Sequence, residues 1–504
     1  MPKYWATFGL DLHVEVDPAS GRRAGLEHAL RDAIRDGRLA PRTLLPSTRA
    51  LAAETGLSRN TVSAAYDQLV AEGYLTARRG SGTSVADVTA TPAEAPRSRG
   101  DAVAPRHDLR PGRPDVTTFP SAAWMRSTRR VLGTASPSVY GYGDPRGAPE
   151  LRAALAAHLG RTRGVLATAD QIVVTSGAVQ ALSLLARVVG AGPKPEVAME
   201  DPGLRFHREV VRRAGARVLP LPVDGRGART DLLGGDAYAE AGAVVVTPAH
   251  QYPSGVTLHP SRRHALADWA RGGGGLVVED DYDGEFRYDR QPVGALQGMA
   301  PEHVAYLGTA SKTLGPGLRL AWLVLPRHLV GPVVDAKRHA DHHTESLGQL
   351  VLADLITSHA YDRHVRACRL RYRRRRDLLV SRLAPAAVQD AAPLALQAVP
   401  SALQAVPLAL QGMAPVFEGS APVAVQGVAA GLHAMVTLPP GGPDEAAVLA
   451  ACAARGVAVQ GLAGHWHAPD DAPGRPQGLI VGYGTPTEAA YPAALDALVA
   501  ALRA

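Results

Sequence analysis

Residues 306–326 read YLGTASKTLGPGLRLAWLVLP, two apolar runs on either side of a turn of small residues. The apolar runs predict strands over Val304–Leu307 and Leu320–Leu325, and the turn between them presents Lys312. Similar short runs predict further strands at Ile172–Thr175, Val244–Thr247 and Leu276–Val278. Continuous β-branched runs are typical of a parallel sheet that helices cover on both faces. We therefore expect an α/β fold for residues 108–504.

Lysine is rare in this chain, which draws attention to Lys312. The 54 Lys and Arg residues include four lysines: Lys3, Lys194, Lys312 and Lys337. Arginine stays protonated and cannot form a Schiff base with a carbonyl compound, whereas lysine can. Lys312 is therefore a candidate for covalent attachment of a carbonyl cofactor. Arg319, Thr309 and Ser311 lie close to it and could bind the phosphate of such a cofactor.

The stretch VVEDDYDGEF at 277–286 places acids at the end of a predicted strand. An acid at this position can pair with a pyridine nitrogen and keep the ring protonated, which makes the ring an electron sink. Asp280 is the candidate for this pairing, and Tyr282 for donation to the ring's phenolic oxygen. The three carboxylates from Glu279 to Asp281 also suit a metal, but no His stands at helical or hairpin spacing beside them. No metal site is expected.

The stretch QIVVTSGAVQALSLLARVV at 171–189 predicts a strand, a turn and a helix. The turn contains Ser176, Gly177 and Ala178, whose backbone N–H groups at a helix start would form a cradle for a phosphate. Many α/β turns share this pattern, so it supports the cofactor prediction only in combination with Lys312 and Asp280.

The amino-terminal region predicts a helix-turn-helix. Arg22–Gly37 has helical periodicity. A second helix is expected to start at Ser47 and end at Gly56, and a third to start with Ser58 as N-cap and run to about Glu72. Two helices joined by a tight turn containing glycine are typical of DNA-binding units.

The start of the third helix carries the side chains expected to contact bases. They are Ser58, Arg59, Asn60 and Thr61, at the end of the helix that enters the major groove. Arg78 and Arg79 then precede a glycine-rich tip, which suits a wing against phosphate or minor groove. The formal net charge of +7 is mild for 504 residues, so the pattern of residues, not net charge, indicates DNA binding.

Composition and length set the domain organisation. A chain of 504 residues with 46% hydrophobic residues is long and apolar enough for two to four folded domains, which excludes a wholly disordered protein. We expect a DNA-binding domain over residues 1–86, a Pro- and Ala-rich linker over 87–107 and the α/β domain over 108–504. A low-complexity surface insertion is expected at about 385–430, because a seven-residue repeat with prolines occupies 394–415; partner binding by this repeat is the alternative.

Two further observations concern the compartment. The two cysteines, Cys368 and Cys452, cannot form a disulfide framework, which favours a reducing environment. The start of the chain lacks a signal-peptide pattern, and no uncharged apolar run is long enough to span a membrane. We expect a cytoplasmic protein without a membrane partner.

Two clusters of basic residues are expected to lie at the surface or to cap a helix. The arginines of RACRLRYRRRRDLL at 366–379 spread around a helix, so a solvated helix is expected, with an auxiliary DNA contact as the alternative. His339, His342 and His343 are expected to be exposed or to cap a helix.

Longer motifs resemble two known families. PSTRALA, GLSRNTVSAAYDQLVAEGYL and RRGSGT, within residues 46–83, resemble the winged helix of the GntR family. By that resemblance Arg49, Arg59 and the wing residue Gly82 would contact a double-stranded DNA operator. YGYGDPRGAPELRAAL (140–155), EDPG (200–203), VVVTPAHQYPSG (244–255) and YLGTASKTLGPGLR (306–319) together resemble a fold-type I aminotransferase domain. The combination is similar to the MocR family of regulators.

The resemblance implies a cofactor and an assembly. The cofactor would be pyridoxal 5'-phosphate, attached at Lys312, with the other contacts as assigned above. Tyr142 would reach a phosphate across a head-to-tail homodimer interface, and Tyr252 would contact the ring. The fold implied is a mostly parallel central sheet flanked by helices, with a smaller carboxy-terminal α+β subdomain.

The sequence also departs from the family pattern. Leu204 follows Pro202-Gly203 where the family often has an aromatic residue over the ring, and Val179 replaces a commonly polar residue. Aminotransferases that act on amino acids clamp the substrate carboxylate with an arginine where this chain has Ile480; Arg475 lies nearby in a Pro/Gly loop.

Three functions stay open at this stage. The first is a regulator that senses an adduct of the cofactor with a small amine, and the second is a regulator for which free pyridoxal phosphate is the effector. The third is an active aminotransferase whose winged helix is accessory, although the missing arginine disfavours it.

Overall fold

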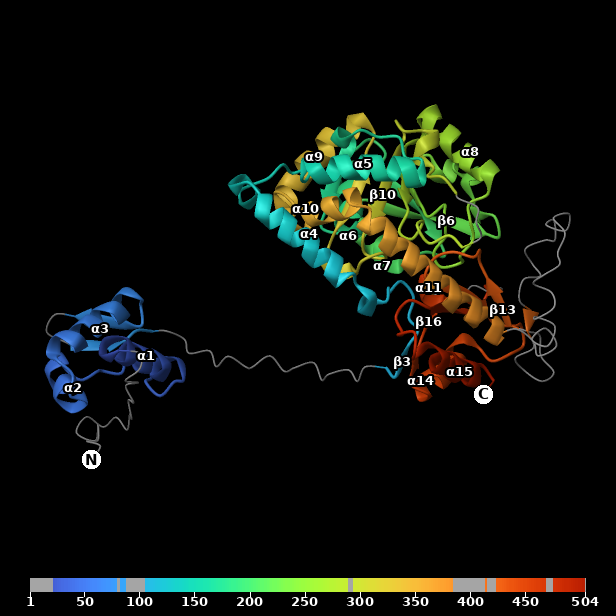
Figure 1. Ribbon diagram of the computed structural model, residues 1–504. Helices are drawn as coiled ribbons and strands as arrows, with labels where there is room; N and C mark the ends of the chain where they lie inside the picture. The colour runs from blue at the N-terminus through green and yellow to red at the C-terminus, as the bar shows by residue number, and fades with distance from the viewer. Residues whose placement is uncertain are drawn as a thin grey trace. The chain divides into compact units, whose positions relative to one another are not determined.

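The computed structural model describes residues 21–78, 82–87, 105–288, 293–383, 413–414, 423–467 and 475–503 (Figure 1). The chain divides into two compact units, Met1–Ala104 and Pro105–Ala504. Arg79 and most of the 394–415 repeat lie outside the described residues. No helix of the described residues is long and apolar enough to cross a membrane.

The first unit is a three-helix core with a two-stranded wing. Its elements are α1 (Arg22–Arg35), α2 (Thr48–Thr55), α3 (Arg59–Ala71), β1 (Leu75–Arg78) and β2 (Gly82–Val85). The wing strands pair antiparallel. The three helices bury one apolar face each, and this core contains Leu26, Leu30, Leu51, Val62, Tyr66 and Leu69. The predicted helix-turn-helix is confirmed.

Capping explains the boundaries of α2 and α3. The Ser47 side chain accepts from Ala50 N, and Gly56 ends α2 with φ of 71°, a left-handed conformation that favours glycine. The Ser58 side chain accepts from Thr61 N and so starts α3. These contacts are local in sequence, which is why the residue pattern alone predicted them.

The second unit is built on an eight-stranded sheet. Its strand order is β4 (Ile172–Thr175), β11 (Ala321–Val324), β10 (Val304–Thr309), β9 (Leu276–Asp280), β8 (Ala241–Val246), β5 (Glu196–Asp201), β6 (Arg217–Asp224) and β7 (Gly227–Ala228). The pairs from β10 to β6 are parallel. β11 runs antiparallel to both β10 and β4, so β4 and β10 point the same way. The sheet is mostly parallel, as expected.

Helices cover both faces of this sheet. Alternate residues of one strand enter different cores: Val173 packs with the core of α6 (Ala178–Gly190), while Ile172 and Val174 pack with the other. The core with α6 also includes α7 (Arg205–Arg213) and α9 (Arg327–Asp341). The opposite face carries α5 (Pro149–Arg163), α8 (Pro260–Trp269) and α10 (Ser346–Thr357). Burial on both faces accounts for the continuous apolar strands.

The carboxy-terminal part forms a smaller α+β subdomain. Its sheet has the order β12 (Met413–Ala414), β13 (Val423–Gln426), β14 (His433–Thr437), β17 (Gly478–Gly482) and β16 (Gln460–Gly461). It also contains α14 (Glu445–Ala454) and α15 (Tyr491–Leu502). In Figure 1 the long helix α11 (Ala360–Leu383) leads from the large sheet to this subdomain. Residues 423–426, which the predicted insertion includes, form β13 of this sheet.

The segment before the large sheet joins the subdomain. β3 (His107–Asp108) pairs in parallel with β15 (Val457–Ala458). The Arg375 guanidinium is 2.8 Å from Asp115 and donates to the carbonyls of Tyr483 and Gly484. Arg375 and Asp115 are both buried. Three distant chain segments therefore meet at one buried ion pair.

Candidate functional site

A cavity of about 360 Å³ lies where several strands of the large sheet end. β4, β5, β8, β9 and β10 share one direction, so their carboxyl ends meet at one edge, where open α/β sheets bind ligands. Eight of the eleven predicted cofactor residues line the cavity: Ala178, Tyr252, Asp280, Tyr282, Thr309, Ser311, Lys312 and Arg319. Ser176, Gly177 and Tyr142 do not.

Lys312 follows β10 and extends into this cavity. Its Nζ donates to the Gly112 carbonyl at 2.6 Å. Burial lowers the pKa of the Lys312 ammonium, and the nearby carboxylates of Asp283 and Asp280 oppose this effect. A lowered pKa makes the neutral amine, the nucleophilic form, more accessible.

Asp280 is the last residue of β9 and is buried in the cavity wall. Burial raises its pKa to about 7, and the neighbouring Asp281 carboxylate adds to this effect. His207, from α7, places Nδ1 3.7 Å from the Asp280 carboxylate. Burial, with the charge of Lys312, lowers the pKa of His207 to about 4, so at neutral pH this imidazole is uncharged.

Arg319, Thr309 and Ser311 form a part of the cavity wall that suits an anion. The Arg319 guanidinium donates to the Ser176 carbonyl at 2.5 Å. Gly177 has φ of 98°, and a Cβ there would lie 2.6 Å from the same guanidinium. Thr309 donates to the Ser311 hydroxyl at 2.9 Å. Ser176 and Gly177 do not line the cavity, but the Ser176 carbonyl binds Arg319, which does, and Gly177 leaves room for its guanidinium.

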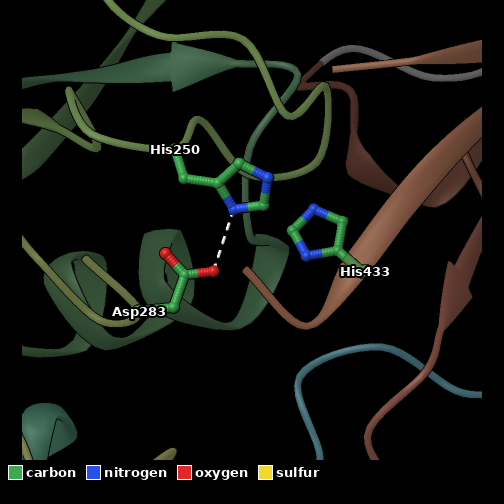
Figure 2. A group of neighbouring side chains, drawn as sticks. All are labelled: His250, Asp283 and His433. Carbon is green, nitrogen blue, oxygen red and sulfur yellow. Dashed lines mark hydrogen bonds and ion pairs between the residues drawn. The ribbon is translucent and has the colours of Figure 1, made fainter. Parts of the chain in front are cut away.

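A polar cluster lies behind Tyr282. The Tyr282 hydroxyl is 3.1 Å from the His250 carbonyl, to which it donates, and 3.2 Å from His250 Nδ1. The same ring nitrogen is 2.8 Å from the Asp283 carboxylate. Figure 2 shows this pair with the His433 ring beside it. These three buried side chains are of metal-ligating types, and their ligand atoms lie within 4.8 Å of one another. His250 and Asp283 are also joined by a hydrogen bond.

His433 belongs to β14 of the smaller subdomain. Its ring lies 4.8 Å from the His250 ring and 5.0 Å from the Tyr252 ring. Burial, together with the neighbouring His250, lowers the pKa of His433 well below its ordinary value. Tyr252 is close to Gln460 and His465 as well, at 3.3 Å from its hydroxyl. This side of the cavity is therefore made by both sheets.

The three consecutive carboxylates do not converge. Asp280 faces the cavity, while Glu279 accepts from the backbone N–H groups of Leu296 and Gln297. Asp281 pairs with Arg163 at 2.7 Å. Alternation along a strand explains why neighbouring residues point to opposite faces.

The departures from the family pattern can also be located. Leu204 and Val179 line the cavity. The position at which the family often has an aromatic residue therefore carries an aliphatic side chain here. Ile480 is buried in β17 between Met435 and Gln460 and does not line the cavity. Arg475 stacks on the Trp466 ring at 5.1 Å.

Tyr142 and the three histidines lie on the surface. Tyr142 is 87% exposed, and its ring lies 4.9 Å from that of His342. His342 follows α9 as its C-cap, and His343 Nδ1 is 3.0 Å from the Thr344 carbonyl. His339 is exposed.

Sequence reasoning missed several residues of the cavity. His207, Gly112 and Glu200 all line it. Burial raises the pKa of Glu200 to about 7, although Thr247 and Gln251 donate to its carboxylate. The EDPG motif contained a signal for Glu200, but its proximity to Thr247 depends on the pairing of β5 with β8.

The predicted DNA-contacting residues of the first unit lie at its surface. Arg49, Arg59, Asn60, Arg78 and Gly82 are exposed. The hydroxyls of Ser58 and Thr61 are 2.8 Å apart, and Ser58 also caps α3. These two side chains are therefore already engaged at the helix start.

The arginine-rich helix α11 is not uniformly solvated. Arg375 is buried, whereas Arg363, Arg366, Arg373 and Arg374 are exposed. Its buried face, with Cys368 and Tyr372, packs in the core of the smaller subdomain.

Comparison with known proteins places both units. Residues 23–85 match the model of bacterial regulatory proteins of the gntR family, and residues 109–404 match that of aminotransferase class I and II. Among solved structures, an archaeal alanine:glyoxylate aminotransferase has a TM-score of 0.64 at 24% identity and covers 78% of this chain and 89% of its own. The Pyrococcus horikoshii kynurenine aminotransferase has the same TM-score and identity and covers 78% of this chain and 90% of its own. The second unit therefore has the fold-type I aminotransferase architecture.

Relatives with both regions are regulators. The probable rhizopine catabolism regulatory protein MocR of Rhizobium meliloti is 34% identical over 377 residues, 71% of this chain and 76% of that protein. The pyridoxine biosynthesis transcriptional regulator PdxR of Corynebacterium glutamicum is 33% identical over 358 residues, 70% and 77% respectively. The chain belongs to the MocR-type family of helix-turn-helix transcriptional regulators, in which a GntR region precedes an aminotransferase class I/II region.

Proposed function

We propose that this protein is a cytoplasmic, DNA-binding transcription regulator that binds pyridoxal 5'-phosphate at Lys312 and responds to it or to its adduct with a small amine. The observation that supports this most is the cavity that brings Lys312 and Asp280 together at one end of the sheet in a chain with an amino-terminal helix-turn-helix. The winged unit would supply DNA binding and the cavity would supply the response.

The cavity residues fit this cofactor. Lys312 supplies an amine of lowered pKa, and Asp280 a buried carboxylate for the pyridine nitrogen. Arg319, held by Ser176, supplies a cation for the phosphate. Tyr282, held by the His250–Asp283 pair, would orient toward the ring's phenolic oxygen. When bound, the cofactor supplies an electron-withdrawing ring and an aldehyde that condenses with amines.

His207 and Leu204 adapt the cavity to the ring. Both line it, and His207 lies beside Asp280. An uncharged imidazole there does not compete with the pyridine nitrogen for the carboxylate, because it carries no positive charge at neutral pH.

We further propose a head-to-tail homodimer. Tyr142 is exposed and lies outside the cavity of its own chain. In such a dimer its hydroxyl would contact the cofactor phosphate of the partner. Crosslinking of the cofactor-loaded protein, with Tyr142→Phe as the variant of lowered cofactor affinity, checks this arrangement.

Aminotransfer is the weaker alternative. Arg208 and Arg319 are the arginines that line the cavity in the described residues. Arg208 already donates to the carbonyls of Gly203, His465 and Trp466. Arg319 is assigned to the phosphate, so no arginine remains to clamp a substrate carboxylate.

The test is binding of the full chain to the DNA upstream of its own gene, with and without pyridoxal phosphate, by gel shift. We expect a shift that the cofactor alters. Lys312→Ala should bind the same DNA but lose the response to added cofactor. An unchanged response in this variant would contradict sensing through Lys312.

Two further arms separate the alternatives. Titration with pyridoxal phosphate in the absence of amine distinguishes a response to the free cofactor from a response that needs an amine. Steady formation of a keto acid from an amino acid by the loaded protein would instead support the aminotransferase.

A further inference from the structure

A second cavity, of about 480 Å³, lies apart from the first, between α5, α11 and the chain segment that follows β9. Five arginines line it: Arg161, Arg163, Arg287, Arg366 and Arg369. Two carboxylates, of Glu285 and Asp362, also line it. Arg163 is paired with Asp281, which lies outside the lining. The size of the cavity is that of a small-molecule site.

Both carboxylates already have partners. Glu285 accepts from the Tyr361 hydroxyl at 3.1 Å and lies 3.3 Å from His158 Nε2. Asp362 pairs with Arg161 at 2.8 Å. Asp362 is therefore paired with an arginine, whereas Glu285 contacts the side chains of a tyrosine and a histidine.

Two arginines of α11 lack a carboxylate partner within the described part of the chain. Arg366 donates to the Asp362 backbone carbonyl at 3.3 Å. Arg369 donates to the Glu285 backbone carbonyl at 2.9 Å and 2.7 Å. They stand three residues apart, one turn of the helix, and therefore present their guanidinium groups on the same face.

Paired guanidinium groups at a concave surface select for anions. A guanidinium binds a carboxylate or a phosphate through two parallel hydrogen bonds, and these are stronger than bonds between neutral groups. A neutral or cationic ligand would leave Arg366 and Arg369 without a negatively charged partner among the described residues. A single inorganic anion would fill little of the cavity, whereas an organic molecule with two anionic groups would contact both arginines.

We propose that this cavity binds a small organic anion that carries at least two carboxylate or phosphate groups, with Arg366 and Arg369 as its main partners. This site is separate from the cavity of Lys312 and does not depend on the function proposed above. The two are connected through the chain: Arg163 lines the second cavity and pairs with Asp281, next to Asp280.

The experiment is isothermal titration of the full-length protein with citrate and, separately, with pyrophosphate at physiological salt. We expect saturable binding of at least one of them. Arg366→Ala should weaken it about tenfold or more, which corresponds to the loss of a charge-assisted hydrogen-bonded pair. Arg366→Lys should retain part of the affinity, because it keeps the charge and loses the paired geometry.

The variants are chosen to keep the fold. Arg366 is exposed and makes a single long hydrogen bond, so its replacement should not change the melting temperature. Arg374→Ala is the matched control, since Arg374 is an exposed arginine of the same helix that does not line the cavity. Arg319→Ala removes the anion partner of the first cavity and should leave this binding unchanged.

Three results would overturn the proposal. The first is the absence of saturable heat with both probes. The second is binding lost in Arg319→Ala and kept in Arg366→Ala, which would assign the anion to the first cavity. The third is weaker DNA binding by Arg366→Ala with unchanged citrate and pyrophosphate binding, which would make Arg366 a contact to the DNA backbone.

Discussion

At the scale of single residues, burial of the Asp280 carboxylate lowers the stability of the folded chain. Its carboxylate is buried at the end of β9 next to Asp281, and its pKa is raised to about 7. An exposed aspartate titrates near pH 3.9. Between these pH values the folded chain keeps a proton that the unfolded chain has released. Stability therefore falls as pH rises from about 4 to about 7 and stays low above that range.

Asp280→Asn should stabilise the cofactor-free protein at pH 8. Because asparagine does not ionise, the variant escapes the cost of a buried carboxylate, roughly 1–4 kcal/mol from the raised pKa. Its unfolding free energy should also depend less on pH between about 4 and 7. Urea unfolding at several pH values measures both effects, with Asp268→Asn as an exposed control. Equal pH profiles for wild type and Asp280→Asn would contradict the raised pKa.

Gly177→Ala should displace Arg319. The new Cβ would lie 2.6 Å from the guanidinium, at a residue with φ of 98° that disfavours a side chain. We expect affinity for pyridoxal phosphate to fall about tenfold or more, because a charge-assisted bond to the phosphate is lost. Absorbance titration measures the affinity. Gly317→Ala is the control, since nothing lies within 4 Å of a Cβ there. Equal losses of cofactor affinity in both variants would contradict a role of Arg319 in binding the phosphate.

At the scale of elements, we expect α3 and the wing to make different kinds of DNA contact. The exposed start of α3 carries Arg59 and Asn60, whereas Arg78 ends β1 at the tip of the wing. Side chains at a helix start enter the major groove and discriminate bases, while a wing arginine neutralises phosphate. The two elements should therefore respond differently to substitution.

Arg59→Ala should cost about 1–3 kcal/mol of operator binding and relax base preference at one position. Arg78→Ala should weaken binding to all sequences alike and reduce the slope of log affinity against log salt by about 1. Fluorescence anisotropy with operator and scrambled DNA at several salt concentrations distinguishes the two. Arg59→Lys keeps the charge without the paired hydrogen bonds, so it should resemble Arg59→Ala in base preference. The same salt slope and the same specificity in both alanine variants would contradict this difference between the two elements.

At the scale of the whole molecule, the chain is two compact units, and the larger one depends on contacts between distant segments. Arg375 of α11 joins Asp115, near the start of this unit, to the carbonyls of Tyr483 and Gly484 near its end. A buried ion pair is costly to break because the remaining charge stays buried without a partner.

Arg375→Ala should destabilise the second unit by about 3–5 kcal/mol and leave the first unchanged. Calorimetry should resolve two unfolding transitions, one for each unit. Cofactor binding should raise the melting temperature of the second unit, and Arg375→Ala should lower the melting temperature of that same unit alone. Arg374→Ala, an exposed neighbour 3.3 Å from Glu488, should change neither by more than about 1 kcal/mol. A lowered melting temperature of both units in Arg375→Ala would show that they do not unfold independently.

Features that depend on neighbouring residues could be predicted from the sequence. The boundaries of α2 and α3 follow from caps whose partners lie three residues away, so a pattern of residue types specifies them. Lys312 and Asp280 could also be predicted from the sequence, because Asp280 ends an apolar strand and Lys312 lies shortly after the end of another. The carboxyl ends of parallel strands meet at one edge of a sheet. Burial on both faces made those strands visible as continuous apolar runs.

Which distant residues share a cavity depends on the packing of the elements against one another. His207 approaches Asp280, and Gly112 accepts from Lys312, although 73 and 200 residues separate the members of these pairs. The proximity of His207 to Asp280 depends on the order of the strands in the sheet. The proximity of Gly112 to Lys312 depends on the path of the chain before it enters the large sheet. Neither feature has a short-range signal in the sequence. The second cavity has the same origin, because its lining residues on α5 and α11 are far apart in sequence and meet only in the folded unit. Capping and hydrophobic periodicity depend on residues within one or two helical turns of each other, so a sequence pattern reveals them. The cavities depend on the packing of side chains from elements that are distant in sequence.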